Sequence, residues 1–123
     1  MGARRYEDLD AWRLANEVRE KAGRLTKAGG FAPHSWLQSQ LDRATHSACA
    51  NIAEGFGRYK PKVFANSLRI SRGSLLEVND HLRRARDLGL ISAADFKELS
   101  HLTNRAVGAL TRLVAYLETA KEP

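Results

Sequence analysis

The chain has few cysteines and no long apolar run, the two features that mark small secreted proteins and membrane proteins. Its 123 residues include a single cysteine, Cys49, so an internal disulfide bond is excluded. No apolar run approaches the roughly 18 residues that a membrane-spanning helix needs. Arg4 and Arg5 are not followed by an apolar segment, so we expect no secretory signal and no membrane partner. These absences predict a cytoplasmic protein.

Proline and aromatic residues are also scarce. Three prolines leave long stretches free to form helices, and nine aromatic residues are too few for an aromatic core. Because 43% of the residues are hydrophobic, the chain can still bury one modest aliphatic core. We therefore expect a single domain over residues 1–123. The few aromatics also argue against base stacking as the main way of holding a nucleic acid.

Apolar residues recur at spacings of three and four over four stretches, which is typical of amphipathic helices. The stretches cover about residues 8–26, 35–54, 61–88 and 92–119. We expect Gly55 and Gly57 to end the second helix in a left-handed turn, and Pro61 to begin the third. Four long helices joined by short loops predict an all-α fold, an antiparallel up-down-up-down four-helix bundle.

The fourth stretch carries a wider apolar face than one seam of a bundle requires. Leu102, Ala109 and Tyr116 lie beside its main apolar track, and Val107 and Val114 form a third track. Apolar surface of this extent is more stable when it is covered than when it faces water. We therefore expect another copy of the chain to cover it, which predicts a homo-oligomer.

Small residues line the end of the second helix, where a neighbouring backbone can approach closely. Asn51 lies in this lining, so we expect its amide to point inward and to satisfy buried backbone groups. Glu54 is expected to pair either with Arg58, four residues later, or with Arg43. We interpret Asn51 and Glu54 as structural residues.

Gly73 interrupts the third helix, at a cost of about 1 kcal/mol relative to alanine. We expect another helix to cross there, with Ser74 beside the crossing, because a close approach would justify the glycine. The predicted structural motif therefore has six members. They are Asn51, Glu54, Gly55, Gly57, Gly73 and Ser74.

Positive charge is concentrated in one part of the chain. The net charge is +6, and the span 55–90 contributes +5 of it, from eight basic and three acidic residues. Such a concentration favours a polyanionic partner, RNA or DNA. Because guanidinium and ammonium groups bind phosphate, we expect nine residues to contact a nucleic acid. They are Arg58, Lys60, Lys62, Arg69, Arg72, Arg83, Arg86, Arg105 and Arg112.

Four of these arginines form a stripe along the third helix. Arg69 and Arg83 lie on one line of heptad spacing, and Arg72 and Arg86 lie on the next. We expect the stripe roughly 100° or more around the helix from its apolar seam. The alternative is that these side chains are merely solvated or form ion pairs, since charges on helices are usually solvated.

No combination of residues predicts catalysis, a metal or a cofactor. Glu98 and His101 form one Glu-x-x-His pair, whereas a di-iron bundle needs two such pairs and two further glutamates. His46 and Cys49 supply only two of the three or four ligands that zinc sites use. Gly55-Phe56-Gly57 lacks the Gly-Lys-Ser/Thr of a phosphate loop. We therefore expect no enzyme, no metal and no cofactor.

Three motifs carry a resemblance to a known family. The longest runs from Gln40 to Arg58, QLDRATHSACANIAEGFGR, around an Asn-Ile-Ala-Glu-Gly run. Tyr6-Glu7-Asp8-Leu9 with Trp12 precedes it, and Gly73-Ser74-Leu75 with Glu77 follows it. Together they resemble the four-helix bundle family encoded in intervening sequences of bacterial 23S rRNA genes, often labelled as S23-type ribosomal proteins. That family is similar to the accessory variability protein of diversity-generating retroelements.

The resemblance implies a ring of five identical subunits, and it favours a nucleic acid and a protein partner such as a reverse transcriptase. Two hypotheses stay open. In the first, the bundle binds RNA or DNA by its backbone, which predicts a steep dependence on salt. In the second, the chain is a structural or adaptor oligomer that docks a protein partner, and its binding depends on shape.

Overall fold

The computed structural model describes residues 2–120, and four long helices account for most of them. The helices are α1 (Asp10–Lys27), α2 (Ser35–Phe56), α3 (Pro61–Asp87) and α4 (Ala93–Glu118). Two short 3-10 helices, η1 (Tyr6–Asp8) and η2 (Ala32–His34), precede α1 and α2. No strand occurs in this part of the chain, and the predicted all-α fold is confirmed. No helix within residues 2–120 is both long and apolar enough to cross a membrane.

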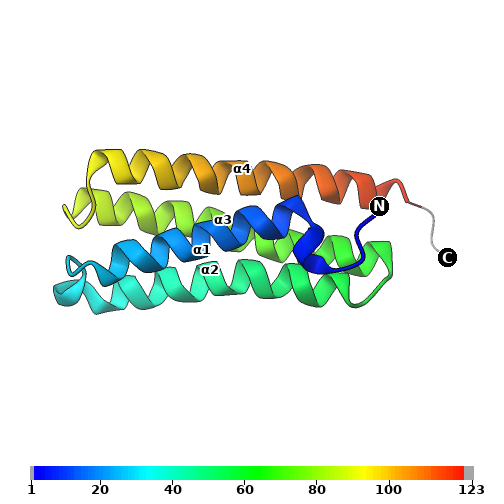
Figure 1. Cartoon of the computed structure of the whole chain (residues 1–123), viewed down its shortest axis with the longest axis horizontal. Helices are drawn as coiled ribbons and strands as arrows, with labels where there is room; N and C mark the ends of the chain where they lie inside the picture. Colours follow the sequence, from blue (N-terminus) through cyan, green and yellow to red (C-terminus); the bar gives the residue numbers. More distant parts are fainter. Residues whose placement is uncertain (1, 121–123) are drawn as a thin grey trace.

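The four long helices form a bundle in which each packs against two neighbours: α1 and α3 on α2, and α1 and α3 on α4. In Figure 1 the chain runs from right to left along α1 and α3, and from left to right along α2 and α4. The connection 57–60 between α2 and α3 therefore lies at one end, which we call the α2–α3 end. The α1–α2 and α3–α4 connections lie at the other, the α1–α2 end.

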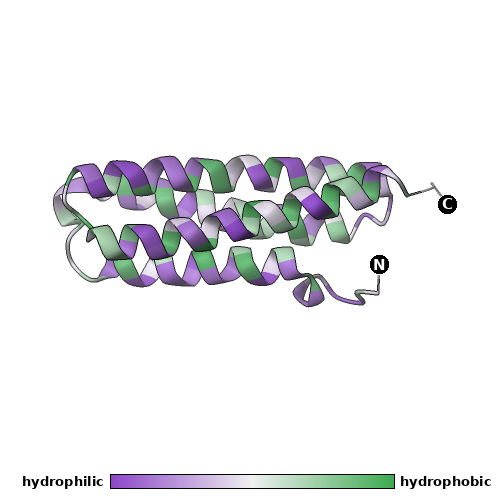
Figure 2. Ribbon diagram, turned by 90° about the horizontal axis from the view of Figure 1, so that it is seen from above, coloured by the Kyte–Doolittle hydropathy of each residue, from purple (hydrophilic) through white to green (hydrophobic). Residues whose placement is uncertain are grey.

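The core is aliphatic, as the scarcity of aromatic residues predicts. Its largest fully buried side chains include Leu37, Leu41, Ile52, Leu68, Leu75, Leu82, Leu99 and Leu110. Buried alanines on all four helices let the backbones approach one another. Figure 2 shows apolar and hydrophilic residues mixed along every helix, as expected when one flank is buried and the other is wet.

The wide apolar face of α4 is buried within the bundle itself. Leu102, Ala109 and Val114 are buried, and Val107 is half-buried. Of the predicted extra tracks, Tyr116 alone is exposed. The apolar width of α4 therefore gives no argument for a second copy on this face, because α1 and α3 already cover the two flanks of α4.

The end of α2 differs from the prediction. Gly55 lies inside α2, and Gly57 is right-handed, with φ −71° and ψ −12°. The left-handed residue is instead Tyr59, with φ 67°. The Lys60 N–H donates to the Arg58 carbonyl oxygen at 2.8 Å, which closes a γ-turn around Tyr59. The chain thus reverses at a tyrosine and not at either glycine.

The ends of α3 and α4 follow their local sequence. Gly89 has φ 74° at the end of α3, and the Leu90 N–H donates back to the Ala85 carbonyl oxygen at 2.9 Å. This is the left-handed glycine that commonly ends a helix. At the start of α4, the Ser92 hydroxyl oxygen accepts a hydrogen bond from the Asp95 N–H at 3.0 Å, which caps the helix.

Gly55 marks the close approach of two helices that the sequence analysis assigned to Gly73. A Cβ atom on Gly55 would lie 2.6 Å from the Cβ of Ser67 and 3.0 Å from a ring carbon of Phe64, both on α3. Gly73 is exposed, and a Cβ atom there would meet nothing within 4 Å. The prediction of a helix crossing at Gly73 is therefore wrong. The neighbouring Ser74 is buried and faces α2.

Candidate nucleic-acid interface

The α2–α3 end carries several basic residues, and no acidic residue lies between them in the sequence. The span 55–76 contains five basic residues and no aspartate or glutamate. Arg58, Lys60 and Lys62 lie in or directly after the connection, and all three are exposed. Arg58 Nη2 lies 2.9 Å from Glu54 Oε1, the i,i+4 pair that the spacing predicts. Within the described residues, neither lysine side chain has an acidic partner.

The amino terminus of α3 adds to this charge. Its N-cap residue is Lys60, no side chain accepts a hydrogen bond from its first turn, and that turn holds no acidic residue. A helix amino terminus carries a partial charge of about +0.5, which an anion or an acidic side chain stabilises. In α4 this role is filled by Ser92 and Asp95. The amino terminus of α3 therefore attracts negative charge from outside the chain.

The arginine stripe is exposed to solvent, but three of its four side chains also contact α4. Arg69 Nη2 lies 3.0 Å from Glu118 Oε2 of α4, and Arg72 Nε donates to Thr111 Oγ1 at 3.1 Å. The Arg86 guanidinium lies 4.4 Å from the centroid of the Phe96 ring. These three arginines hold α3 and α4 together.

Three of the four members thus have partners on α4, although all four side chains are exposed. The helical period gives the angle of each residue around its own axis, but it does not say where the next helix lies. Arg83 is the exception. Its side chain is exposed and makes no ion pair or hydrogen bond with any described residue.

Arg105 and Arg112 lie elsewhere, in a groove of about 610 Å³ between α1 and α4. Arg13 and Glu17 of α1 also line it, and Arg13 lies 3.7 Å from Asp10. Within residues 2–120, no acidic side chain pairs with Arg105 or Arg112. Eight of the nine predicted residues thus divide into three groups: the α2–α3 end, the α3–α4 flank and the α1–α4 groove. The ninth, Arg83, is exposed on α3 outside these groups.

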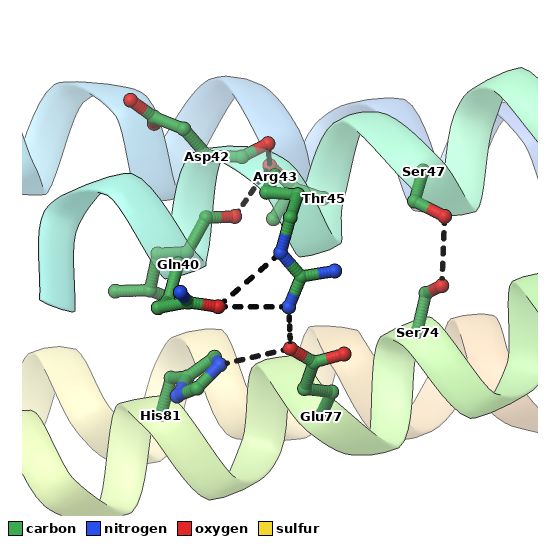
Figure 3. A network of polar contacts seen from close by, with 9 residues as sticks. Gln40, Asp42, Arg43, Thr45, Ser47, Ser74, Glu77 and His81 are labelled. Carbon is green, nitrogen blue, oxygen red and sulfur yellow. Dashed lines mark hydrogen bonds and ion pairs between the residues drawn. The ribbon is translucent and has the colours of Figure 1, made fainter. Parts of the chain in front are cut away.

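A polar seam joins α2 to α3 (Figure 3). Arg43 Nη2 donates to Gln40 Oε1 at 2.8 Å and pairs with the Glu77 carboxylate of α3. His81 Nε2 lies 3.1 Å from the same carboxylate. Because Arg43 is held by Glu77, the alternative that it pairs with Glu54 is wrong. These charges serve helix packing.

Ser47, Asn51 and Ser74 extend this seam. The hydroxyl oxygens of Ser47 and Ser74 lie 3.0 Å apart, across the two helices. Asn51 Nδ2 donates to the Ser47 carbonyl oxygen at 2.9 Å and to its hydroxyl oxygen at 3.2 Å. Asn51 is half-buried and its backbone partner lies on its own helix. These contacts support the structural interpretation of Asn51 and Ser74.

The candidate metal ligands do not form a cluster in the described part of the chain. Among the described residues, no three histidine, cysteine, aspartate or glutamate side chains gather where they could hold a metal ion. Glu98 pairs with Lys21 of α1 at 3.1 Å, while His101 lines the α1–α4 groove. Cys49 is buried, and burial raises the pKa of its thiol, so the reactive thiolate is scarce at neutral pH.

Four exposed residues were not singled out as a surface from the sequence. Tyr59 is 90% exposed at the α2–α3 end. On α3, Ile70 is 57% exposed, Leu76 47% and Val63 36%. Val63 and Ile70 are seven residues apart and lie outside the buried apolar track of α3 that begins at Phe64. This second apolar spacing could have identified them from the sequence.

Known proteins share this fold and sequence pattern. The model of a family described as 23S rRNA-intervening sequence protein matches residues 7–112. A similar solved structure is a protein of unknown function from the S23 ribosomal protein family of Bacteroides thetaiotaomicron. It has a TM-score of 0.66 and 19% identity, over 83% of this chain and 98% of that one, a likeness that shows the fold alone. A search of the curated proteins found no match.

Proposed function

Because the chain belongs to the 23S rRNA-intervening sequence protein family, we propose that it is a non-enzymatic protein that binds RNA or DNA through the phosphate backbone. One observation carries the proposal: among the described residues, Lys60 and Lys62 at the α2–α3 end have no acidic partner. The span 55–76 has no acidic residue, and Lys60 and Lys62 flank the uncapped amino terminus of α3. A polyanion supplies the charge that this end lacks.

The exposed cations favour contacts to phosphate over contacts to base edges. Arg83, Arg105 and Arg112 have no acidic partner among the described residues, so their guanidinium groups can form paired hydrogen bonds with phosphate oxygens. They lie on different parts of the bundle, where a flexible strand can reach them one after another. Such contacts fix position and carry no sequence information.

We propose further that the protein acts as a homo-oligomer. Val63 and Ile70 are exposed, and as neighbours at heptad spacing they lie about 10 Å apart on α3. An apolar pair on an otherwise charged surface is a suitable contact for a second copy. A ring of five, which the family resemblance implies, would multiply the phosphate contacts without any new type of contact.

A second candidate function is a protein-docking adaptor, and Leu76 favours it. This exposed leucine lies on α3 within two turns of Arg69, Arg72 and Arg83. An exposed apolar side chain with arginines on the same helix is typical of protein interfaces. A reverse transcriptase is one such partner, and the relation to the accessory variability protein on which it depends stays a prediction.

The experiment that separates the two candidates is binding to labelled single- and double-stranded RNA and DNA across a salt series. The molar mass of the protein would be recorded in the same buffers. Phosphate binding predicts that log K falls linearly with log salt and that heparin competes. Absence of binding at low salt by the assembled protein would contradict the proposal and favour the adaptor.

A further inference from the structure

Tyr59 is the most exposed of the nine aromatic residues, all of which lie in the described part of the chain. Its exposed fraction is 90%, against 53% for Trp36 and 50% for Tyr116. Most other aromatic rings have a packing role. Phe31 and Phe64 are buried, Phe56 contacts Phe64 edge to face, Tyr6 contacts Trp12 in the same way, and Phe96 lies under Arg86.

The backbone at Tyr59 is unusual for a tyrosine. Its φ of 67° is left-handed, and the hydrogen bond from the Lys60 N–H to the Arg58 carbonyl oxygen closes a tight turn around it. Glycine or asparagine adopts this conformation more easily. Since the ring makes almost no contact with the bundle, packing does not explain why a tyrosine occupies the position. A role in contacting a ligand would explain the exposed ring.

Cations lie on both sides of this ring along the chain. Arg58 precedes it, and Lys60 and Lys62 follow it, while the nearest carboxylate along the sequence, Glu54, is paired with Arg58. An aromatic face between cations is the arrangement with which proteins hold single strands. The ring stacks on a base while the cations bind the phosphates on either side of it.

We infer that Tyr59 is a stacking platform for one unpaired base of a single-stranded nucleic acid, with Lys60 and Lys62 on the adjacent phosphates. The inference rests on the proposed function and names its ligand class and point of contact. In a duplex the faces of internal bases are already stacked, so a strand with accessible bases is preferred. Every base has such a face, so the contact is tolerant of sequence. The small number of aromatics argued against stacking, but a single displayed ring is enough for one base.

The test compares a short labelled single-stranded DNA with an abasic strand of the same length, by fluorescence anisotropy with the full chain. Tyr59→Ala is expected to weaken binding of the normal strand by about five-fold to a hundred-fold. Binding of the abasic strand is expected to stay unchanged, because that strand has no base to stack. Tyr59→Phe keeps the aromatic face and is expected to bind both strands as the wild type does.

Two further variants control for folding and for the loss of an aromatic ring as such. Tyr59→Gly suits the left-handed backbone, so it folds at least as well as the wild type, and it is expected to lose the same binding as Tyr59→Ala. Trp36→Ala removes a half-exposed ring at the α1–α2 end, far along α2 from the connection 57–60. It is expected to bind both strands normally.

Four results would overturn the inference. If Tyr59→Ala binds the normal strand as tightly as the wild type does, the ring does not stack, although salt-dependent binding of both strands would leave the proposed function intact. If both strands lose affinity equally, the tyrosine acts on the backbone. If the molar mass falls instead, Tyr59 lies between copies of the chain. Absence of binding to either strand at low salt would remove the proposed function as well.

Discussion

Cys49 is buried where α2 packs on α1, and burial raises the pKa of its thiol above the ordinary value of 9.0. We expect a thiol reagent at about pH 8 to modify the native protein about ten-fold or more slowly than the urea-unfolded protein, because the thiolate is both rarer and less accessible. Rapid modification of the native protein, at the rate of the unfolded chain, would contradict the burial of this side chain.

The same pKa shift predicts a dependence of stability on pH. The folded thiol keeps its proton at a pH where the unfolded thiol has lost it. The stability linked to Cys49 is therefore complete below the ordinary pKa and declines as the pH rises through the raised value. Cys49→Ala should make the free energy of unfolding fall less than that of the wild type between about pH 8 and pH 10. Equal falls would contradict this account.

Some single residues could be assigned from spacing, and others could not. The pairing of Glu54 with Arg58 follows from four residues on one helix, so it depends only on local geometry. The left-handed turn at Tyr59 could not be predicted, because Gly55 and Gly57 offered less strained positions. Gly55 is not available for a turn, since it must stay inside α2 to let α3 approach. A contact between helices thus decides where the chain reverses.

At the scale of the elements, the crossing of α2 and α3 depends on the missing side chain of Gly55. Gly55→Ala would place a Cβ atom 2.6 Å from the Cβ of Ser67, so the helices must move apart. We expect the free energy of unfolding in urea to fall by about 1–3 kcal/mol, as is typical of overpacked cores.

Gly73→Ala is the matched control, because both positions are glycines within helices. A Cβ atom at Gly73 meets nothing within 4 Å, so the substitution changes only helix propensity. We expect it to raise the free energy of unfolding by about 0.5–1 kcal/mol. If Gly55→Ala is neutral, or if both substitutions have the same effect, the assignment of the close approach to Gly55 is wrong.

The elements were more predictable than their mutual orientation. All four helices could be placed from periodicity because each buries one flank, and the observed ends lie within two residues of the expected ones. The arginine stripe could be placed on α3, but its contacts with α4 could not. Glu118 and Thr111 lie far from Arg69 and Arg72 in sequence, and Phe96 lies on the helix after that of Arg86, so only the assembled bundle brings these pairs together. For the same reason, the sequence could not show that the apolar width of α4 is covered within the bundle.

At the scale of the whole molecule, the proposed assembly depends on exposed apolar residues of α3. Ile70 is 57% exposed, and Ile70→Glu places a charge in the proposed contact between copies. We expect the molar mass in solution, measured by light scattering, to fall towards that of the 13.7 kDa monomer. Ala115→Glu introduces the same charge on an exposed part of α4 and should leave the assembly intact. An unchanged molar mass for Ile70→Glu would place the interface elsewhere.

The central claim is that the α2–α3 end binds phosphate, and a pair of charge-matched variants tests it most directly. Lys60→Gln with Lys62→Gln removes two positive charges there, and Lys27→Gln with Lys97→Gln removes two exposed charges at the α1–α2 end. The measurement is the affinity for one labelled single strand as a function of salt. The account predicts that only the Lys60→Gln, Lys62→Gln variant binds more weakly. Its slope of log K against log salt should also be shallower by about one to two units. Equal losses in both variants would mean that only net charge matters, and would contradict a binding surface at the α2–α3 end.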